Sequence, residues 1–185
     1  MSFPIIKIAA FTFFFFFFIN YLYMNFEEKL ITGEFIKRYK RFFVDVKIGD
    51  NTITAHCPNT GSMRGLLVKG NPVWLTKSEN PSRKLKYTLQ IIKNQKSKVG
   101  INTHLTNKIV LDALNKKRID SFKNIENINQ EVRYGKNTRF DFLVTQKTKR
   151  IFIEVKNVTL SRQKGIAEFP DAITSRGLKH IKELL

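Results

Sequence analysis

The stretch that decides the fold of the carboxy-terminal half is Arg139-Phe140-Asp141-Phe142 followed by Ile151-Phe152-Ile153-Glu154-Val155-Lys156. Both runs are rich in aromatic and β-branched residues, a pattern typical of β-strands, and the polar segment Gln146-Lys147-Thr148-Lys149 predicts a tight connection between them. A turn at the centre of this connection would set Asp141 directly opposite Glu154. Opposed residues of an antiparallel pair share one face of the sheet, with Cβ atoms about 5 Å apart.

Lys156 would join the two acids, because strand side chains repeat with period two. Hard divalent cations such as Mg²⁺ bind proteins through one or two carboxylates and keep several waters. An ammonium group beside such an ion could orient a bound water or help to deprotonate it. The pattern therefore predicts a Mg²⁺ or Mn²⁺ site at Asp141 and Glu154, with Lys156 beside it.

The alternative is that these charged side chains are solvated and have no common function. Opposed like charges destabilise a hairpin, so the two carboxylates would then point apart into solvent. The setting favours the metal site. Glu154 and Lys156 alternate with Ile153 and Val155, so the hairpin has one apolar and one acidic face. A chain this basic has little reason to gather acids in one place unless they hold a cation.

The overall charge of the chain points to a polyanionic partner. Among 185 residues, 33 are Lys or Arg and 15 are Asp or Glu, which gives a formal charge of +18. Such an excess is typical of proteins that bind DNA, RNA or an anionic membrane surface. The alternative is an A/T-rich genome, which raises the Lys content without a functional cause. Cys57 is the only cysteine, which excludes an intramolecular disulfide and is consistent with a reducing cytoplasm.

The amino-terminal segment contains six consecutive phenylalanines, Phe13 to Phe18. As a membrane anchor the apolar stretch is short against the roughly 20 residues that spanning requires, and as a signal peptide it has no small-x-small cleavage site before Glu27. We favour a third interpretation, in which translation starts at Met24. Residues 1–23 are then a spurious extension or hydrophobic segment, and no membrane attachment is expected.

The remaining chain has two regions that differ in their predicted secondary structure. Between residues 35 and 91, short alternating strands are separated by turns such as Gly49-Asp50-Asn51, which predicts a small twisted barrel. A helix capped by Asn102 or Thr103 follows, then a polar segment over 115–129, a strand over 131–134, the acidic hairpin, and a helix opened by Asp171. We therefore expect a mixed α/β protein of two domains, residues 24–86 and 87–185.

Five segments, in this order, resemble the sugar fermentation stimulation protein A family of bacteria and archaea. They are residues 56–63 (HCPNTGSM), 131–135 (EVRYG), 139–142 (RFDF), 153–160 (IEVKNVTL) and 169–180 (FPDAITSRGLKH). The resemblance covers about residues 35–185. It implies an amino-terminal OB-fold barrel, a carboxy-terminal domain like the PD-(D/E)xK nucleases, DNA binding without marked sequence preference, and a regulatory role in maltose metabolism.

On this resemblance, Asp141, Glu154 and Lys156 fall on the D…ExK positions, and Glu131 on a further acidic position. Residues 1–23 have no counterpart in the family. The family also continues beyond the position of Leu185, so we expect an incomplete second domain with one uncovered sheet edge.

Two functions stay open from the sequence. The first is metal-assisted phosphodiester hydrolysis by Asp141, Glu154, Lys156 and Glu131. The second is a DNA-binding regulator of sugar metabolism without chemistry. DNA is favoured over RNA as partner, a homodimer is left open, and the expected location is the cytoplasm.

The predicted nucleic-acid surface begins with the densest basic run of the chain, which has an aromatic residue inside it, since OB-fold surfaces combine a basic groove with stacked aromatics. The alternative for these residues is a solvated strand edge guarded by lysines. The residues assigned to this surface are Lys37, Arg38, Tyr39, Lys40, Arg41 and Arg64, together with Arg176 and Lys179 on the last helix.

Two further features are interpreted as structural. His56, His104 and His180 show no metal-ligand spacing. The loop Cys57–Met63 contains Pro58, Asn59 and Gly61, so a turn is the default, although its backbone amides could also meet phosphate.

Overall fold

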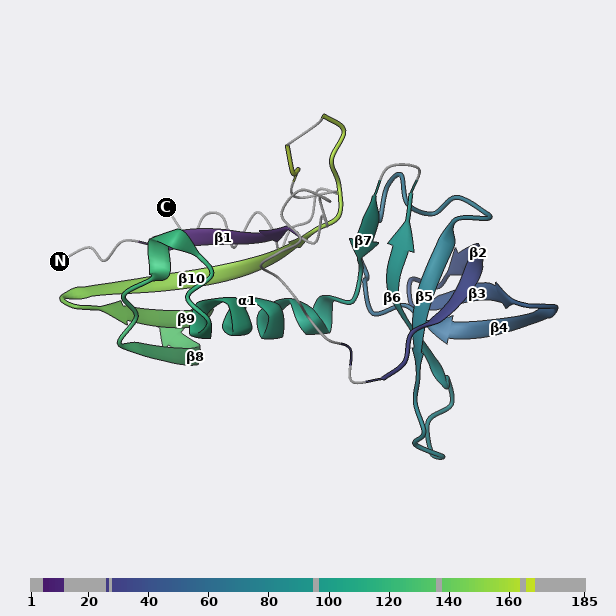
Figure 1. Cartoon of the computed structure of the whole chain (residues 1–185), viewed down its shortest axis with the longest axis horizontal. Helices are drawn as coiled ribbons and strands as arrows, with labels where there is room; N and C mark the ends of the chain where they lie inside the picture. Colours follow the sequence, from purple (N-terminus) through teal and green to yellow (C-terminus); the bar gives the residue numbers. More distant parts are fainter. Residues whose placement is uncertain are drawn as a thin grey trace. The chain divides into compact units, whose positions relative to one another are not determined.

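A computed structural model of the chain describes residues 5–11 (backbone only), 26, 28–94, 97–135, 138–163 and 166–168. The chain divides into two compact units (Figure 1). We call residues 11–104 with 158–172 the barrel unit, and residues 1–10 with 105–157 and 173–185 the hairpin unit. The division falls at Leu105 rather than at residue 87, so the strands between these positions belong to the barrel.

The barrel unit is a sheet that closes on itself. The strands in its described part run in the order β4-β3-β2-β5-β6-β7, and neighbours are antiparallel. A parallel pairing of His56 with Thr88 joins β4 to β6 and closes a five-stranded OB-like barrel, which confirms the predicted fold. The strands are β2 (Ile31–Tyr39), β3 (Phe43–Ile48), β4 (Asn51–His56), β5 (Pro72–Lys77), β6 (Tyr87–Lys93) and β7 (Lys98–Gly100).

Alternation along the strands fills the barrel interior with apolar side chains. Val44 and Val46 of β3 and Ala55 of β4 are fully buried, so the residues between them face outward. The predicted turn at Gly49 and Asp50 is confirmed, because Ile48 pairs with Asn51 and Gly49 adopts φ +57°.

Gly33 lies where β2 and β3 approach each other closely. A Cβ at this position would lie 2.6 Å from Val46 Cγ1 and 2.7 Å from the carbonyl oxygen of Lys47. Real Cβ atoms do not approach backbone oxygens this closely, so the pairing of β2 with β3 requires a glycine here.

The hairpin unit is a four-stranded sheet with a helix. Its strand order is β1-β10-β9-β8, and its parts are β1 (Ile5–Phe11), α1 (Thr106–Asn115), β8 (Asn127–Tyr134), β9 (Thr138–Gln146) and β10 (Lys149–Val158) (Figure 1). Short 3-10 segments occupy Thr103–Leu105 and Asp120–Phe122. The helix therefore begins after a 3-10 turn rather than at a cap on Asn102 or Thr103, and β8 begins within the segment expected to be a polar loop.

The two faces of this sheet have separate cores. One face packs against α1 through Val110 and Leu114, and its strand residues are Phe142, Val144, Ile151, Ile153 and Val155. The other face contains the cluster Phe140, Leu143 and Phe152, with Val132 beside it.

The sheet edge at β10 and the two ends of the chain can be compared with the predictions. One sheet edge was expected to be uncovered; in the described residues β10 has β1 as its neighbour, so part of residues 1–23 forms a strand. Phe13–Phe18, Asp171, Arg176 and Lys179 lie outside the described residues. Of the helices in the described part, none is long and apolar enough to cross a membrane.

We predict that Gly33→Ala destabilises the barrel by about 1–3 kcal/mol, because the added methyl group must displace the Lys47 backbone. Urea unfolding measures the effect. Gly49→Asn is the control, since nothing lies within 4 Å of that position and asparagine tolerates its positive φ. Equal unfolding free energies for Gly33→Ala and the unmutated protein would contradict the close approach.

Candidate functional site

The acidic hairpin has the predicted register. Lys149 pairs with Gln146, and the pairing continues to Ile153 with Phe142. The next pair along would be Glu154 with Asp141. There the described pairing ends, and the Val155 amide donates a hydrogen bond of 2.6 Å to Oδ2 of Asp141. The Asp141 side chain thus takes the place of a backbone acceptor on β9.

The second carboxylate oxygen of Asp141 is also engaged. Asn107 on α1 donates from Nδ2 to Oδ1 of Asp141 over 2.8 Å. Asp141 therefore ties together α1, β9 and β10 through two hydrogen bonds to one charged group, and such bonds are stronger than those between neutral partners.

The side-chain alternation of β9 breaks at Asp141. Residues two apart on a strand normally share a face, yet Phe142 belongs to the core under α1 while Phe140 packs on the opposite face, 5.1 Å from Phe152 between ring centroids. Asp141 reaches the helix, whereas Glu154 continues the phase of Phe152. The expected common face of Asp141 and Glu154 is therefore not found, because the Asp141 side chain bonds the strand backbone and the helix instead.

Glu154 and Lys156 do lie together as the period-two argument expects. Glu154 is 8% exposed, and Lys156 Nζ donates to its Oε1. A carboxylate this deeply buried needs a charged or hydrogen-bonding partner, because loss of hydration costs several kcal/mol. The lysine supplies that partner.

Glu131 lies in β8 between the register pairs Gln130–Phe142 and Val132–Phe140, which sets its backbone across from Asp141. Its φ of +53° is unusual for a residue with a side chain. The carboxylate is largely exposed and lies 3.4 Å from Nη1 of Arg139. Glu131 is thus a neighbour of Asp141 along the backbone, while its charge is paired elsewhere.

The oxygen donors of these acids suit a metal ion, whereas their arrangement does not bring them together around one. Carboxylate oxygens are the ligands that hard cations prefer. Within the described part of the chain, however, no three His, Cys, Asp or Glu side chains gather closely enough to hold an ion. The acids are arranged as separate pairings, Asp141 with Asn107 and Glu154 with Lys156.

On the barrel unit, the predicted basic run divides into residues with different roles. The guanidinium of Arg38 donates to the carbonyl oxygens of Asn59 at 2.6 Å and Gly61 at 2.8 Å. Its Nε donates to the carbonyl of Arg41 at 3.0 Å. Arg38 therefore anchors the loop after β4, and its donors are committed to backbone oxygens.

The turn from β2 to β3 leaves its cations exposed. Lys40 and Arg41 adopt φ of +48° and +61°, and both side chains are in solvent. Arg64 is exposed as well. The loop Cys57–Met63 is an ordered turn, in which the buried Asn59 accepts the Gly61 amide at 2.8 Å, and burial raises the pKa of the Cys57 thiol.

The outer face of the barrel also carries residues that the sequence analysis missed. Phe43 pairs in register with Tyr39 on one side and with His56 on the other. Burial lowers the pKa of His56, and the nearby charges of Arg83 and His104 lower it further. In the sequence, Phe43 and His56 alternate with the apolar residues Val44 and Ala55, which indicates that they face outward. That they are neighbours follows only from the register between the strands.

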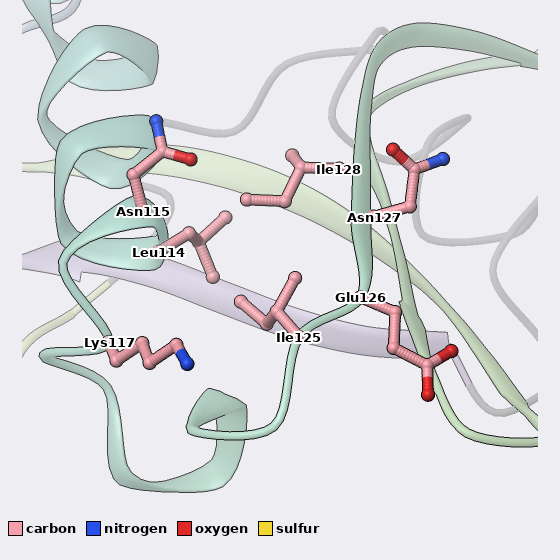
Figure 2. A pocket seen from close by; sticks show the side chains of 7 residues that line it. All are labelled: Leu114, Asn115, Lys117, Ile125, Glu126, Asn127 and Ile128. Carbon is pink, nitrogen blue, oxygen red and sulfur yellow. The ribbon is translucent and has the colours of Figure 1, made fainter.

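Two further features lie away from these sites. A shallow hollow of about 360 Å³ lies between the end of α1 and the start of β8 (Figure 2). It is lined by Leu114, Asn115, Lys117, Ile125, Glu126, Asn127 and Ile128, and includes none of the predicted site residues.

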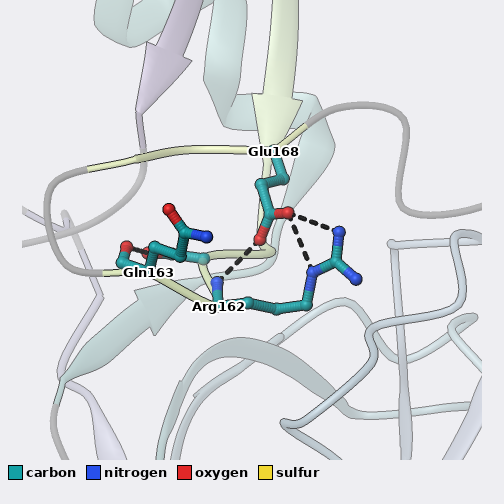
Figure 3. Close-up of polar contacts among 4 residues, drawn as sticks. Arg162, Gln163 and Glu168 are labelled. Carbon is teal, nitrogen blue, oxygen red and sulfur yellow. Dashed lines mark hydrogen bonds and ion pairs between the residues drawn. The ribbon is translucent and has the colours of Figure 1, made fainter.

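The basic loop after β10 is partly neutralised. Arg162 donates from Nε and Nη2 to one oxygen of Glu168, at 2.8 and 2.6 Å, and its backbone amide donates to the other (Figure 3). The hydrogen bond from the Arg162 side chain lowers the pKa of Glu168. The charge of Arg162 is therefore used to close the loop.

The chain is similar to known proteins along most of its length. The family descriptions that match are the SfsA N-terminal OB domain over residues 36–101 and the sugar fermentation stimulation protein RE domain over residues 104–185. A sugar fermentation stimulation protein homolog of Pelagibacter ubique is 56% identical over 162 residues, which cover 88% of this chain and 70% of that protein. The homolog of Maricaulis maris is 45% identical over 163 residues, covering 87% and 69%.

A solved structure, that of Pyrococcus furiosus SfsA in complex with Ca²⁺, superposes with a TM-score of 0.73 at 27% identity and covers 87% of this chain and 68% of that one. The matches over both domains and the named relatives thus agree on one family. The chain belongs to the sugar fermentation stimulation protein (SfsA) family.

Proposed function

We propose that this protein binds DNA without marked sequence preference through the outer surface of its barrel unit. The observation that carries the proposal is the position of the cations. In OB-folds, oligonucleotides contact the second and third barrel strands and the loops between strands one and two and between strands four and five. In this barrel those are β3 and β4, the turn with Lys40 and Arg41, and the loop Ser78–Lys86.

The loop between β5 and β6 is rich in basic residues, like the turn after β2. It contains Arg83, Lys84 and Lys86, and of these Lys84 is exposed. Contacts from such side chains go to phosphates, release counterions and carry no sequence information. The net charge of +18 favours the same kind of ligand. A regulator of sugar metabolism that binds DNA and catalyses no reaction would require only this surface.

We predict that replacing Lys40 and Arg41 by glutamine weakens duplex binding and lowers the slope of log K against log salt by roughly 2, about 0.9 for each lost phosphate contact. Fluorescence anisotropy over a series of NaCl concentrations measures the slope. The control replaces Lys147 and Lys149, exposed at the β9–β10 turn, by glutamine and removes the same charge. Equal losses in both variants, or binding insensitive to salt, would contradict the assignment to this surface.

The second candidate function is divalent-metal binding by the hairpin unit, with phosphodiester hydrolysis as the reaction that a Mg²⁺ or Mn²⁺ ion would support. It is favoured by the Ca²⁺ in the complex of Pyrococcus furiosus SfsA and by the hard oxygen donors of Asp141 and Glu154. Lys156 would stand beside the ion and Glu131 at its edge. For both acids to hold one ion, Asp141 must exchange the contacts it makes with Asn107 or the Val155 amide.

We predict that Asp141→Asn and Glu154→Gln each weaken Mn²⁺ and Ca²⁺ binding at least roughly tenfold in calorimetry and abolish any Mn²⁺-dependent DNA cleavage. DNA binding in EDTA should be unchanged, because the barrel surface is intact. Asp120→Asn is the control, since that acid is exposed and paired with Lys123.

Because Asp141 also holds the ends of β9 and β10, Asn107→Ala shows what loss of its helix contact alone does to metal binding and stability. An unmutated protein that binds neither ion would refute the metal site. One that binds metal and cuts no DNA would favour the regulator.

A further inference from the structure

We propose that the outer face of β2, β3 and β4 is a stacking platform for unpaired bases, so that single-stranded DNA is the ligand this barrel selects. The inference rests on the proposed nucleic-acid function and names the ligand class. The platform consists of Tyr39, Phe43 and His56, which hold adjacent positions on three neighbouring strands (Figure 1 shows the strands).

The register makes these side chains neighbours on one face. Tyr39 pairs with Phe43, and Phe43 pairs with His56. Directly opposed residues share a face, and adjacent strands are about 4.8 Å apart, so the row spans roughly 10 Å. Val44, which follows Phe43 on β3, and Ala55, which precedes His56 on β4, are fully buried in the core. The row therefore faces outward.

Tyr39 and the adjoining Phe42 are the accessible rings at this surface. Tyr39 and Phe43 are stacked with centroids 5.5 Å apart and an interplanar angle of 14°. Tyr39 is 37% exposed, and Phe42 in the adjoining turn is 48% exposed. Large aromatic side chains exposed together are unusual in a hydrophilic surface and point to a ligand with its own π-face.

Cations flank the row at both ends. Lys37 Nζ lies 5.6 Å from the centre of the Tyr39 ring, and Lys40 and Arg41 follow in the turn. At the other end, Arg83 donates to Oγ1 of Thr88 at 2.6 Å, and Thr88 pairs with His56. Phosphates on either side of the stacked bases would thus meet positive charge.

An acid, Asp45, lies beside the row. It is paired with Lys37 at 3.6 Å and accepts hydrogen bonds from the Tyr39 hydroxyl at 3.2 Å and from Thr54 at 2.8 Å. The charge of Asp45 is therefore engaged by its neighbours on this face. Burial lowers the pKa of His56, which favours the neutral ring, and a neutral ring suits stacking.

A duplex can contact the flanking cations but cannot stack on these rings, because its bases are stacked on one another and present only their edges in the grooves. Unpaired bases expose their faces, and every base has one, so stacking adds affinity without sequence preference. The row of rings between two sets of cations therefore distinguishes single strands from duplexes by shape.

The test is fluorescence anisotropy with three labelled probes, a thymidine 12-mer, a 12-base-pair duplex and an abasic 12-mer with the same phosphates. The unmutated protein should bind the thymidine strand roughly tenfold tighter than either other probe. Tyr39→Ala should remove most of that advantage and leave binding of the abasic strand unchanged. Tyr39→Phe should retain the advantage, because the ring is kept.

The control variant is Tyr134→Ala, which removes an aromatic ring of similar exposure, 41%, from the hairpin unit. It should bind all probes as the unmutated protein does. Equal affinity for the thymidine and abasic strands, unaffected by Tyr39→Ala, would overturn the platform and leave nucleic-acid binding by charge intact. Failure to bind any probe at low salt would refute both the platform and the proposed function.

Discussion

The pairing of β2, β3 and β4 is the constraint on which the proposed nucleic-acid surface of this protein depends. Burial of Val44, Val46 and Ala55 in the barrel core fixes which residues of these strands face outward. Because strand side chains alternate, a slip of one residue would turn the outward row into the core and the core into solvent. Gly33 permits the close approach that sets this register, since a side chain there would collide with the Lys47 backbone. The surface chemistry thus follows from packing inside the barrel.

In the hairpin unit, one carboxylate has a comparable influence. Asp141 accepts the Val155 amide and the Asn107 side chain, and the alternation of β9 breaks at the same residue. A charged acceptor with two donors is strongly held, so binding of a cation requires the ion to replace at least one of these hydrogen bonds. Metal binding and the anchoring of α1 to the sheet would therefore compete for the same oxygens. This competition is a physical reason why the acidic pattern alone does not define a metal site.

Much of the fold could be predicted from the sequence because its signals are local. The hairpin register follows from the polar connection between two β-rich runs, the barrel from short alternating strands with turns at residues such as Gly49, and the pairing of Glu154 with Lys156 from period two. The predicted boundary at residue 87 differs from the division at Leu105, because β6 and β7 have the sequence pattern of ordinary strands and only their pairing, β6 with β5 and β7 with β6, assigns them to the barrel.

The parts that could not be predicted depend on contacts distant in sequence or on side chains that bond the backbone. Arg38 reads as a phosphate ligand within a basic run, yet its acceptors lie 21 and 23 residues away in the loop after β4. Asp141 does not lie on the expected face, because its side chain accepts the Val155 amide in place of a strand carbonyl. Side-chain periodicity does not predict a bond of this kind. Phe43 and His56 become neighbours only through the β3–β4 register.

The central claim is that nucleic acid binds the outward row on β2, β3 and β4, and amide chemical-shift mapping by NMR tests it most directly. Titration of the labelled protein with a short single-stranded DNA should move the amide signals of Tyr39, Phe43 and His56 and of the turn with Lys40 and Arg41. Signals of β8, β9 and β10 should stay in place in EDTA. The largest shifts in those three strands, with the barrel signals unmoved, would contradict the account.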